Sequence, residues 1–215
     1  MELDEHEQGE LVRKWLRQNG SSLILGIALG LGLVFAWQWW QGQGIRHKQE
    51  AATQYQLFSE AITAKDAAKA KTFSALLGDK YKDTVFAELA TLRYAAFLQD
   101  SGKTADAIKL LHSGAPKSDR ADIQELRQIR LARLYLFDGK PVEARKQLAA
   151  ISKPMFPGVA DELRGDIAVA EGDRELARKS YQQALTNLDQ AAPTRRLVEL
   201  KLIDAGGQPP AQPET

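Results

Sequence analysis

The sequence has 215 residues, with 29 lysines and arginines against 28 aspartates and glutamates, so its formal net charge is +1. Proteins that bind the phosphate backbone carry a basic excess, and this near balance argues against a nucleic-acid partner. The absence of cysteine is compatible with an oxidising compartment. The composition is rich in alanine, leucine, lysine, arginine and glutamate, which favours helices over sheet.

An apolar run near the N-terminus indicates a membrane protein. No charged residue lies in residues 18–45, and the eighteen residues 23–40 would rise about 27 Å as a helix, close to the hydrocarbon thickness of a bilayer. A cleaved signal peptide has a shorter apolar run and a small-residue cleavage site, so the run predicts an uncleaved signal anchor. All four tryptophans flank or close it, as in interfacial aromatic belts: Trp15, Trp37, Trp39 and Trp40.

The anchor predicts a single-pass protein whose two sides face different compartments. Three basic residues precede the run and two follow it closely, a small bias that favours a cytoplasmic N-terminus and an exported C-terminal domain. Gly26 and Gly30 form a GxxxG pattern, which indicates either a packing face for another membrane helix or ordinary spanning sequence. The expected divisions are a tail with a short juxtamembrane helix (1–20), the anchor (21–40), a linker or start of the first helix (41–49), a repeat domain (50–205) and a disordered tail (206–215).

Beyond the anchor, apolar residues recur with a period of 3.6 and predict a series of helices. The first two are joined at Lys65 and Asp66, and Gly78 ends the second. Pro193 precedes the last helix and suits its first turn, and this helix should close the domain as a cap with one polar face. The expected helices, apart from those of the later repeats, are residues 46–64, 67–77, 84–98, 104–111 and 194–204, with a break at 113–116.

Three glycines, Gly102, Gly139 and Gly172, mark an internal repeat with intervals of 37 and 33 residues. Small residues recur seven positions before and five positions after each glycine, and bulky residues recur nine positions after it. This spacing predicts helical hairpins with small residues where the two helices cross. The repeated residues are Ala95, Ala132 and Gly165 (seven before), Leu98, Tyr135 and Ala168 (four before), Ala107, Ala144 and Ala177 (five after), and Leu111, Leu148 and Tyr181 (nine after).

The hairpins resemble tetratricopeptide repeats, whose period is 34 residues. The signature tryptophan is replaced by Thr91, Gln128 and Asp161, and Lys65 stands where the first hairpin should have its turn glycine. The expected fold is therefore all-α: a single N-terminal transmembrane helix followed by a solenoid of degenerate tetratricopeptide-like helical hairpins.

The resemblance also implies a candidate binding surface. In tetratricopeptide proteins the first helix of each hairpin lines a groove that receives peptides or partner helices. The corresponding residues here combine an apolar centre with charged flanks, which suits weak protein binding, with ordinary packing or solvation as the alternative at each position. They are Leu92, Ala96 and Gln99, then Ile129, Arg133 and Leu136, then Glu162, Asp166 and Val169.

Residues that carry catalysis are sparse. The three histidines are scattered, and the sequence contains no metalloprotease motif, phosphate-binding loop or dinucleotide fingerprint. The adjacent acids Asp161 and Glu162 are expected to be solvated, because neighbours on a helix point apart. We therefore expect a protein that is not an enzyme, with no cofactor, no metal and no small-molecule substrate.

The short acidic-then-basic tail, the single anchor, the degenerate hairpins and the closing segment RRLVELKLIDA together resemble the YfgM family of bacterial inner-membrane proteins, tetratricopeptide-like ancillary subunits of the Sec translocon. The resemblance implies a single pass through the inner membrane, a cytoplasmic N-terminus and a periplasmic C-terminal domain. It also implies protein partners: Sec translocon subunits, a membrane-anchored, isomerase-like periplasmic chaperone and exported client chains, whose trafficking and folding the protein would assist.

Two other functions are open at this stage. One is an envelope assembly scaffold that uses the same groove with no tie to export. The other is a hydrolase that uses the paired acids, and mutation of those acids should then abolish turnover and leave partner binding intact. Crosslinking distinguishes the translocon-associated function from the scaffold function by the partner that is captured.

Overall fold

The computed structural model describes residues 5–113 and 120–209 and divides the chain into two units, Met1–Glu50 and Ala51–Thr215. Every regular element among the described residues is a helix, so the predicted all-α fold is confirmed. The helices are α1 (Glu5–Thr63), α2 (Ala67–Lys80), α3 (Val85–Asp100), α4 (Thr104–Ser113), α5 (Ala121–Phe137), α6 (Pro141–Ala149), α7 (Pro157–Ala170), α8 (Arg174–Asn187) and α9 (Arg195–Asp204).

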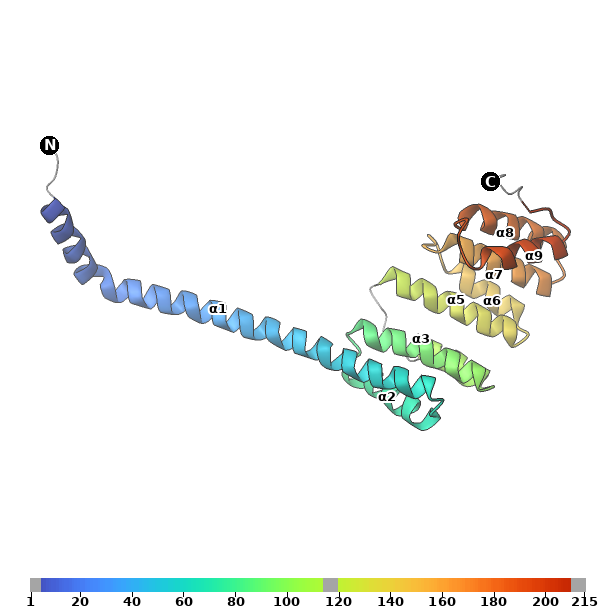
Figure 1. Cartoon of the computed structure of the whole chain (residues 1–215), viewed down its shortest axis with the longest axis horizontal. Coiled ribbons are helices and arrows are strands. Elements are labelled where there is room, and N and C mark those ends of the chain that lie inside the picture. Colours follow the sequence, from blue (N-terminus) through green and yellow to red (C-terminus); the bar gives the residue numbers. More distant parts are fainter. Residues whose placement is uncertain (1–4, 114–119, 210–215) are drawn as a thin grey trace. The chain divides into compact units, whose positions relative to one another are not determined.

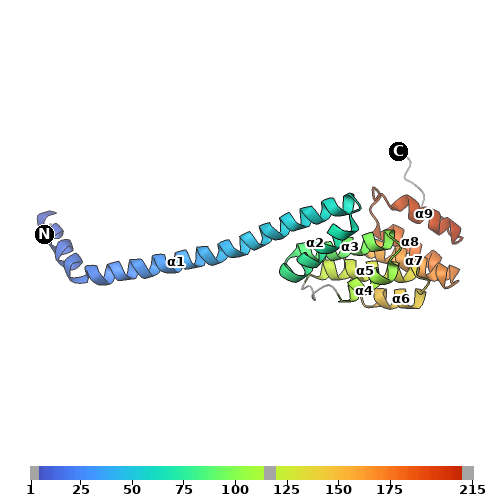
Figure 2. The ribbon, with the colours of Figure 1, turned by 90° about the horizontal axis from the view of Figure 1, so that it is seen from below.

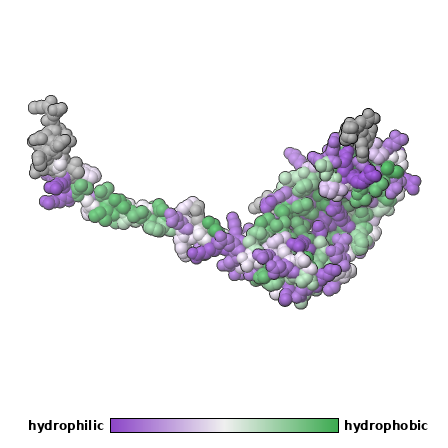
Figure 3. Space-filling view, viewed as in Figure 1, coloured by the Kyte–Doolittle hydropathy of each residue, from purple (hydrophilic) through white to green (hydrophobic). Residues whose placement is uncertain are grey.

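The first unit consists of the greater part of α1. The sequence predicted a juxtamembrane helix, an anchor and a separate helix from residue 46, but the structure has one continuous helix from Glu5 to Thr63. No proline interrupts this sequence, and a glycine inside a helix costs only about 1 kcal/mol relative to alanine. In the described part of the chain, α1 alone is long and apolar enough to cross a membrane. Its apolar section appears green between hydrophilic residues in Figure 3.

The second unit begins with the last turns of α1, and its helical hairpins follow one another from there to α9 (Figures 1 and 2). Each hairpin packs against the first helix of the next, and the buried side chains form four successive clusters. The clusters join α1–α2–α3, α3–α4–α5, α5–α6–α7 and α7–α8–α9, and their most buried large members are Phe58 and Leu77, then Leu111 and Leu134, then Leu163, then Val198 and Leu202. No hairpin buries its apolar face alone, which is the arrangement of a solenoid.

Five helices end in the same backbone turn. In α7, for example, the N–H of Gly172 donates to the carbonyl oxygen of Val169 at 3.0 Å, and the N–H of Asp173 donates to the carbonyl oxygen of Ala168 at 2.9 Å. This paired bonding closes a helix with one residue in the left-handed region. The residues in that conformation are Lys65 (φ 54°), Gly102 (74°), Gly139 (71°), Gly172 (80°) and Gly206 (86°). Lys65 therefore takes the turn conformation that glycine supplies in the later hairpins.

The residues of the predicted register are largely in the core. The alanines five positions after the turn glycines, Ala107, Ala144 and Ala177, are each 0% exposed. The bulky residues nine positions after the glycines and the small ones seven before are buried as well, which confirms the predicted helix crossings. Tyr135, four before Gly139, is the exception: it is half-buried.

Several predicted boundaries were wrong. Gly78 lies inside α2, which continues to Lys80, because a helical glycine with open space around it is tolerated. Pro193 precedes α9, as expected, but the N-cap residue Thr194 stands between it and the first residue of the helix, so the proline does not form the first turn. Ser113 is the last residue of α4, and the rest of the predicted break at 113–116 lies outside the described residues. The predicted disordered tail is described only as far as residue 209.

Candidate functional site

Of the three predicted groove residues that stand ten positions before the turn glycines, two are buried and the third, Leu92, is half-buried. Leu92 packs against the α3–α4–α5 cluster, Ile129 is 3% exposed within the α5–α6–α7 cluster, and Glu162 is 7% exposed. The first helices of successive hairpins contact one another, α3 with α5 and α5 with α7. Packing between these helices therefore takes up the position that sequence analysis assigned to the groove.

The other six predicted residues remain partly or fully accessible, and we call them the first-helix surface. Arg133 is exposed and the side chain of Val169 is 53% exposed, whereas the remaining four are half-buried. Because α3 contacts α5 and α5 contacts α7, these residues lie on first helices that are neighbours in space. The first-helix surface consists of Ala96 and Gln99 on α3, Arg133 and Leu136 on α5, and Asp166 and Val169 on α7.

The two anchor glycines, Gly26 and Gly30, lie one helical turn apart on α1. A Cβ atom added to either would have no other atom within 4 Å. Residues four apart share one face of a helix, so the two glycines offer a narrow strip of exposed backbone. The single chain leaves that strip open, and its pairing with another membrane helix stays a prediction.

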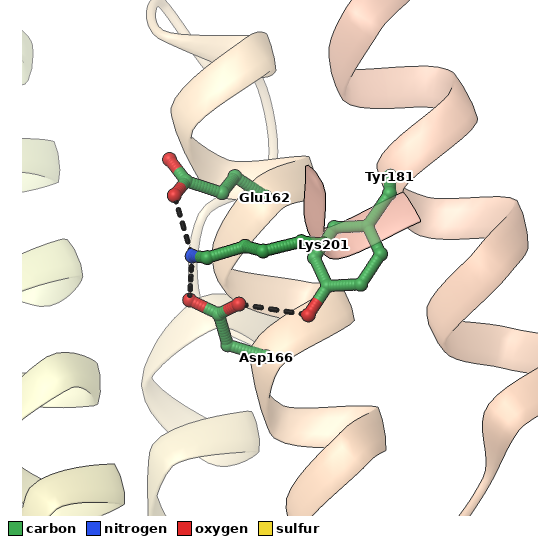
Figure 4. A network of polar contacts seen from close by, with 4 residues as sticks. All are labelled: Glu162, Asp166, Tyr181 and Lys201. Carbon is green, nitrogen blue, oxygen red and sulfur yellow. Dashed lines mark hydrogen bonds and ion pairs between the residues drawn. The ribbon is translucent and has the colours of Figure 1, made fainter. Parts of the chain in front are cut away.

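A partly buried polar network joins α7, α8 and α9 (Figure 4). Lys201 on α9 donates from Nζ to Oε1 of Glu162 at 2.7 Å and to Oδ2 of Asp166 at 2.8 Å. The hydroxyl of Tyr181 on α8 donates to the other oxygen of Asp166, Oδ1, at 2.8 Å. One ammonium group and one phenol thus satisfy two carboxylates between three helices, which fixes α9 on the last hairpin.

Burial and charge act together on the two donors. Burial raises the pKa of Tyr181, and its hydrogen bond to Asp166 raises it further. Burial alone would lower the pKa of Lys201, but the hydrogen bonds to Asp166 and Glu162 outweigh it, and the pKa is raised. Lys201 is therefore held protonated at neutral pH, which suits a structural ion pair and not a nucleophilic amine.

The expectation that Asp161 and Glu162 are solvated was wrong, since each is 7% exposed. The two side chains do point apart, but each meets a partner on a different side of α7. Asp161 accepts a hydrogen bond from Nδ2 of Asn187 at 2.9 Å and is paired with Arg164, whereas Glu162 is bound by Lys201. Because Asn187 on α8 and Lys201 on α9 reach these two acids, both carboxylates are largely shielded from water.

The carboxylate of Glu125, which was not among the residues predicted from the sequence, supports the start of α7. Glu125 on α5 is 4% exposed and accepts hydrogen bonds from the backbone N–H groups of Met155, at 2.6 Å, and Phe156, at 2.9 Å. These donors precede α7, whose N-cap residue makes no side-chain capping bond. The available signal was the position of Glu125 four residues before Ile129, on the apolar face of the same helix.

The sequence agrees with one family model and with several curated proteins. The model described as a tetratricopeptide repeat-like domain matches residues 13–207. A protein from Aggregatibacter actinomycetemcomitans is 27% identical over 93% of this chain and 97% of its own length. Relatives from Escherichia coli (strain K12) and Haemophilus influenzae are 25% and 24% identical, over 83% and 85% of this chain and 86% and 89% of their own lengths.

All three relatives bear the name ancillary SecYEG translocon subunit. The resemblance predicted from the sequence is therefore confirmed. No solved structure matches the chain at a significant level.

Proposed function

The chain belongs to the family of tetratricopeptide repeat-like domains, and from that premise we propose that it is a membrane-anchored protein-interaction module ancillary to the Sec translocon. The observation that carries this proposal is the similarity to three relatives that share one name, over nearly their full lengths. The matched regions take in most of this chain, and the family model begins at residue 13, ahead of the apolar run.

We propose a topology in which the N-terminal tail lies in the cytoplasm, residues 21–40 cross the bacterial inner membrane, and the repeat domain of residues 50–205 lies in the periplasm. Support comes from the apolar section of α1, which is long enough to span a bilayer, and from the small basic excess before it. The anchor would hold the repeats beside the translocon and so raise their effective concentration near emerging chains.

The proposed partners are translocon subunits, a periplasmic isomerase-like chaperone and exported client chains. We propose that they contact the first-helix surface, whose accessible residues include a cation, Arg133, an amide, Gln99, and an apolar side chain, Val169. A surface of this mixed character suits weak, reversible contacts with peptides. The proposed action is tethering, with no bond made or broken.

Site-specific photocrosslinking in intact cells tests the proposal. Probes at Leu25 in the apolar section of α1 and at Val169 on the first-helix surface are 61% and 53% exposed, so both reach a neighbour without disturbing the fold. Ile129 is unsuitable because its side chain is buried. Adducts identified as translocon subunits at Leu25, and as an exported chaperone or client at Val169, would support the proposal.

A probe at Val142 on α6 is the matched control, because this residue is 46% exposed and lies on a second helix. The Val169 adducts should be absent or much weaker there. Recovery of envelope-assembly proteins alone would favour the scaffold function, and an identical set of adducts at Val142 and Val169 would refute the first-helix surface as the binding site.

A further inference from the structure

The last helix carries exposed apolar residues on the face that was expected to be polar. Leu197 and Leu200 are each 50% exposed and Ile203 is 51% exposed, and we call these three residues the α9 strip. The opposite face of α9 is buried against α8 through Val198 and Leu202. A terminal helix that is apolar on both faces is typical of a surface that another element covers.

Two opposite charges flank the α9 strip. Arg196 and Asp204 are both exposed, and neither forms an ion pair within the described part of the chain. The arrangement is symmetric about Leu200: Leu197 and Ile203 stand three residues to either side of it, and Arg196 and Asp204 stand four to either side. An antiparallel copy of the same helix would therefore bring each arginine opposite an aspartate.

We propose that the α9 strip is an interface for a second copy of this chain, with the two α9 helices antiparallel about a two-fold axis at Leu200. In this arrangement Leu200 meets Leu200, Leu197 meets Ile203, and two Arg196–Asp204 pairs close the ends. A parallel arrangement would instead bring like charges together at both ends, which is destabilising. The charge pattern thus selects both the occupant and its direction.

The α9 strip alone supports only a weak dimer. Three half-exposed side chains and their flanking charges bury much less than the roughly 800 Å² per partner of a standard stable interface. Confinement of both copies to one membrane by α1 raises their effective concentration, so a weak contact is populated there. The dimer should therefore be detected in membranes, and the inference does not depend on an association with the translocon.

Cysteine crosslinking in membranes tests the geometry, because the chain has no native cysteine. Leu200→Cys in the full-length protein should form a disulfide dimer on mild oxidation, since the two Cα atoms approach across the axis. Leu197→Cys and Ile203→Cys, produced together with different tags, should give a mixed dimer. Each of these two variants alone should crosslink poorly, because like positions are offset by about 9 Å along the paired helices.

Val142→Cys, on the exposed face of α6, is the matched control for random collision in the membrane. A yield for Leu200→Cys at least several times that of Val142→Cys supports the proposal. Equal yields would overturn it, and so would efficient crosslinking of Ile203→Cys with itself, which would indicate a parallel pair. Dominant adducts between Leu200→Cys and a different protein would show that the strip has another occupant.

Charge reversal provides an independent test on the Leu200→Cys background. Arg196→Asp and Asp204→Arg should each reduce the dimer yield several-fold, because each creates two pairs of like charges. The double variant restores opposite charges at both ends and should recover most of the yield. Both residues are exposed, so the fold should persist, as far-UV circular dichroism would verify. Failure of the double variant to recover the yield would refute the antiparallel pairing.

Discussion

The ring of Tyr181 lies directly against Gly165: a Cβ atom added to Gly165 would lie 2.6 Å from Cδ1 of the ring. Tyr181 lies nine positions after the turn glycine Gly172, and Gly165 lies seven positions before it. The same two positions carry alanine with leucine in the preceding hairpins, so the largest side chain of this series opposes the smallest residue. The alanine and leucine pairs are Ala95 with Leu111 and Ala132 with Leu148.

Gly165→Ala should therefore destabilise the repeat unit. The Tyr181 ring must move to admit a methyl group, and its 2.8 Å hydrogen bond to Asp166 would be strained. Overpacking of this kind lowers the free energy of unfolding by about 1–3 kcal/mol. Urea unfolding of the full-length protein in detergent, followed by circular dichroism, measures the change.

Gly78→Ala is the matched control, because an added Cβ there meets no atom within 4 Å. This change should leave stability unaltered or raise it by up to about 1 kcal/mol. The double variant Gly165→Ala with Tyr181→Leu recreates the pair of the earlier hairpins and should recover part of the loss. Equal stability of Gly165→Ala and Gly78→Ala would contradict the role of the Tyr181 ring.

Lys65→Gly should stabilise the protein. Lys65 has a φ of 54°, in the left-handed region that disfavours side chains by about 1–2 kcal/mol, and the equivalent residues of the later hairpins are glycines. After allowance for the greater flexibility of glycine in the unfolded chain, the expected gain is about 0.5–1 kcal/mol. Thermal unfolding should show a raised midpoint, and a lowered midpoint would contradict the equivalence of the turns.

The sequence predicted the fold well where a local pattern carried it. The charge-free run predicted the apolar helix, and the glycine spacing predicted the crossings, because a left-handed turn followed by a buried alanine leaves a clear pattern. The first hairpin was harder. Phe58 lies seven positions before the turn residue Lys65 and Ser74 lies nine positions after it, and both are buried. Here the large residue precedes the turn and the small one follows it, the reverse of the later hairpins. A search for small residues before the turn does not detect that exchange.

The candidate site was less predictable, because burial at its positions depends on neighbouring helices. Glu162 looks like a surface acid until Lys201, thirty-nine residues later in the chain, is brought beside it. Ile129 has the correct spacing for a groove, yet it faces the next first helix. Likewise, α9 was expected to close the domain with a polar face, and the α9 strip became visible only with the exposures of its residues.

Removal of the Glu125 carboxylate should destabilise the α5–α7 contact. Glu125→Ala would leave the N–H groups of Met155 and Phe156 without their acceptor at the start of α7. Hydrogen bonds to charged groups contribute about 1.5–3 kcal/mol each, and solvent will replace part of them here, so we expect a total loss of about 2–3 kcal/mol. Urea unfolding gives the total, and hydrogen exchange at residues 155–160 locates it.

Glu175→Ala on α8 is a suitable control for the removal of a glutamate. Its carboxylate pairs with Arg178 on the surface of the same helix, an interaction worth about 0.5 kcal/mol or less. Glu125→Ala should thus unfold at a clearly lower urea concentration than Glu175→Ala. Similar midpoints, or unchanged exchange at the start of α7, would show that the two hydrogen bonds contribute little.

The polar network should make the repeat unit lose stability at alkaline pH. The pKa values of Tyr181 and Lys201 are raised above their ordinary values of 10.0 and 10.5, so the folded state holds both protons more tightly than the unfolded chain. Their contribution is complete below about pH 10 and is lost as the pH rises through the raised values.

We expect the variant Tyr181→Phe with Lys201→Met to be less stable than the wild type at pH 8, because Glu162 and Asp166 lose their donors. Between pH 9.5 and 11, however, this variant should lose less further stability than the wild type. Gly78→Ala, which changes no titratable group, should retain the wild-type slope. Urea midpoints measured across this range decide the matter, and parallel curves for wild type and double variant would show that the network does not hold its protons in the folded state.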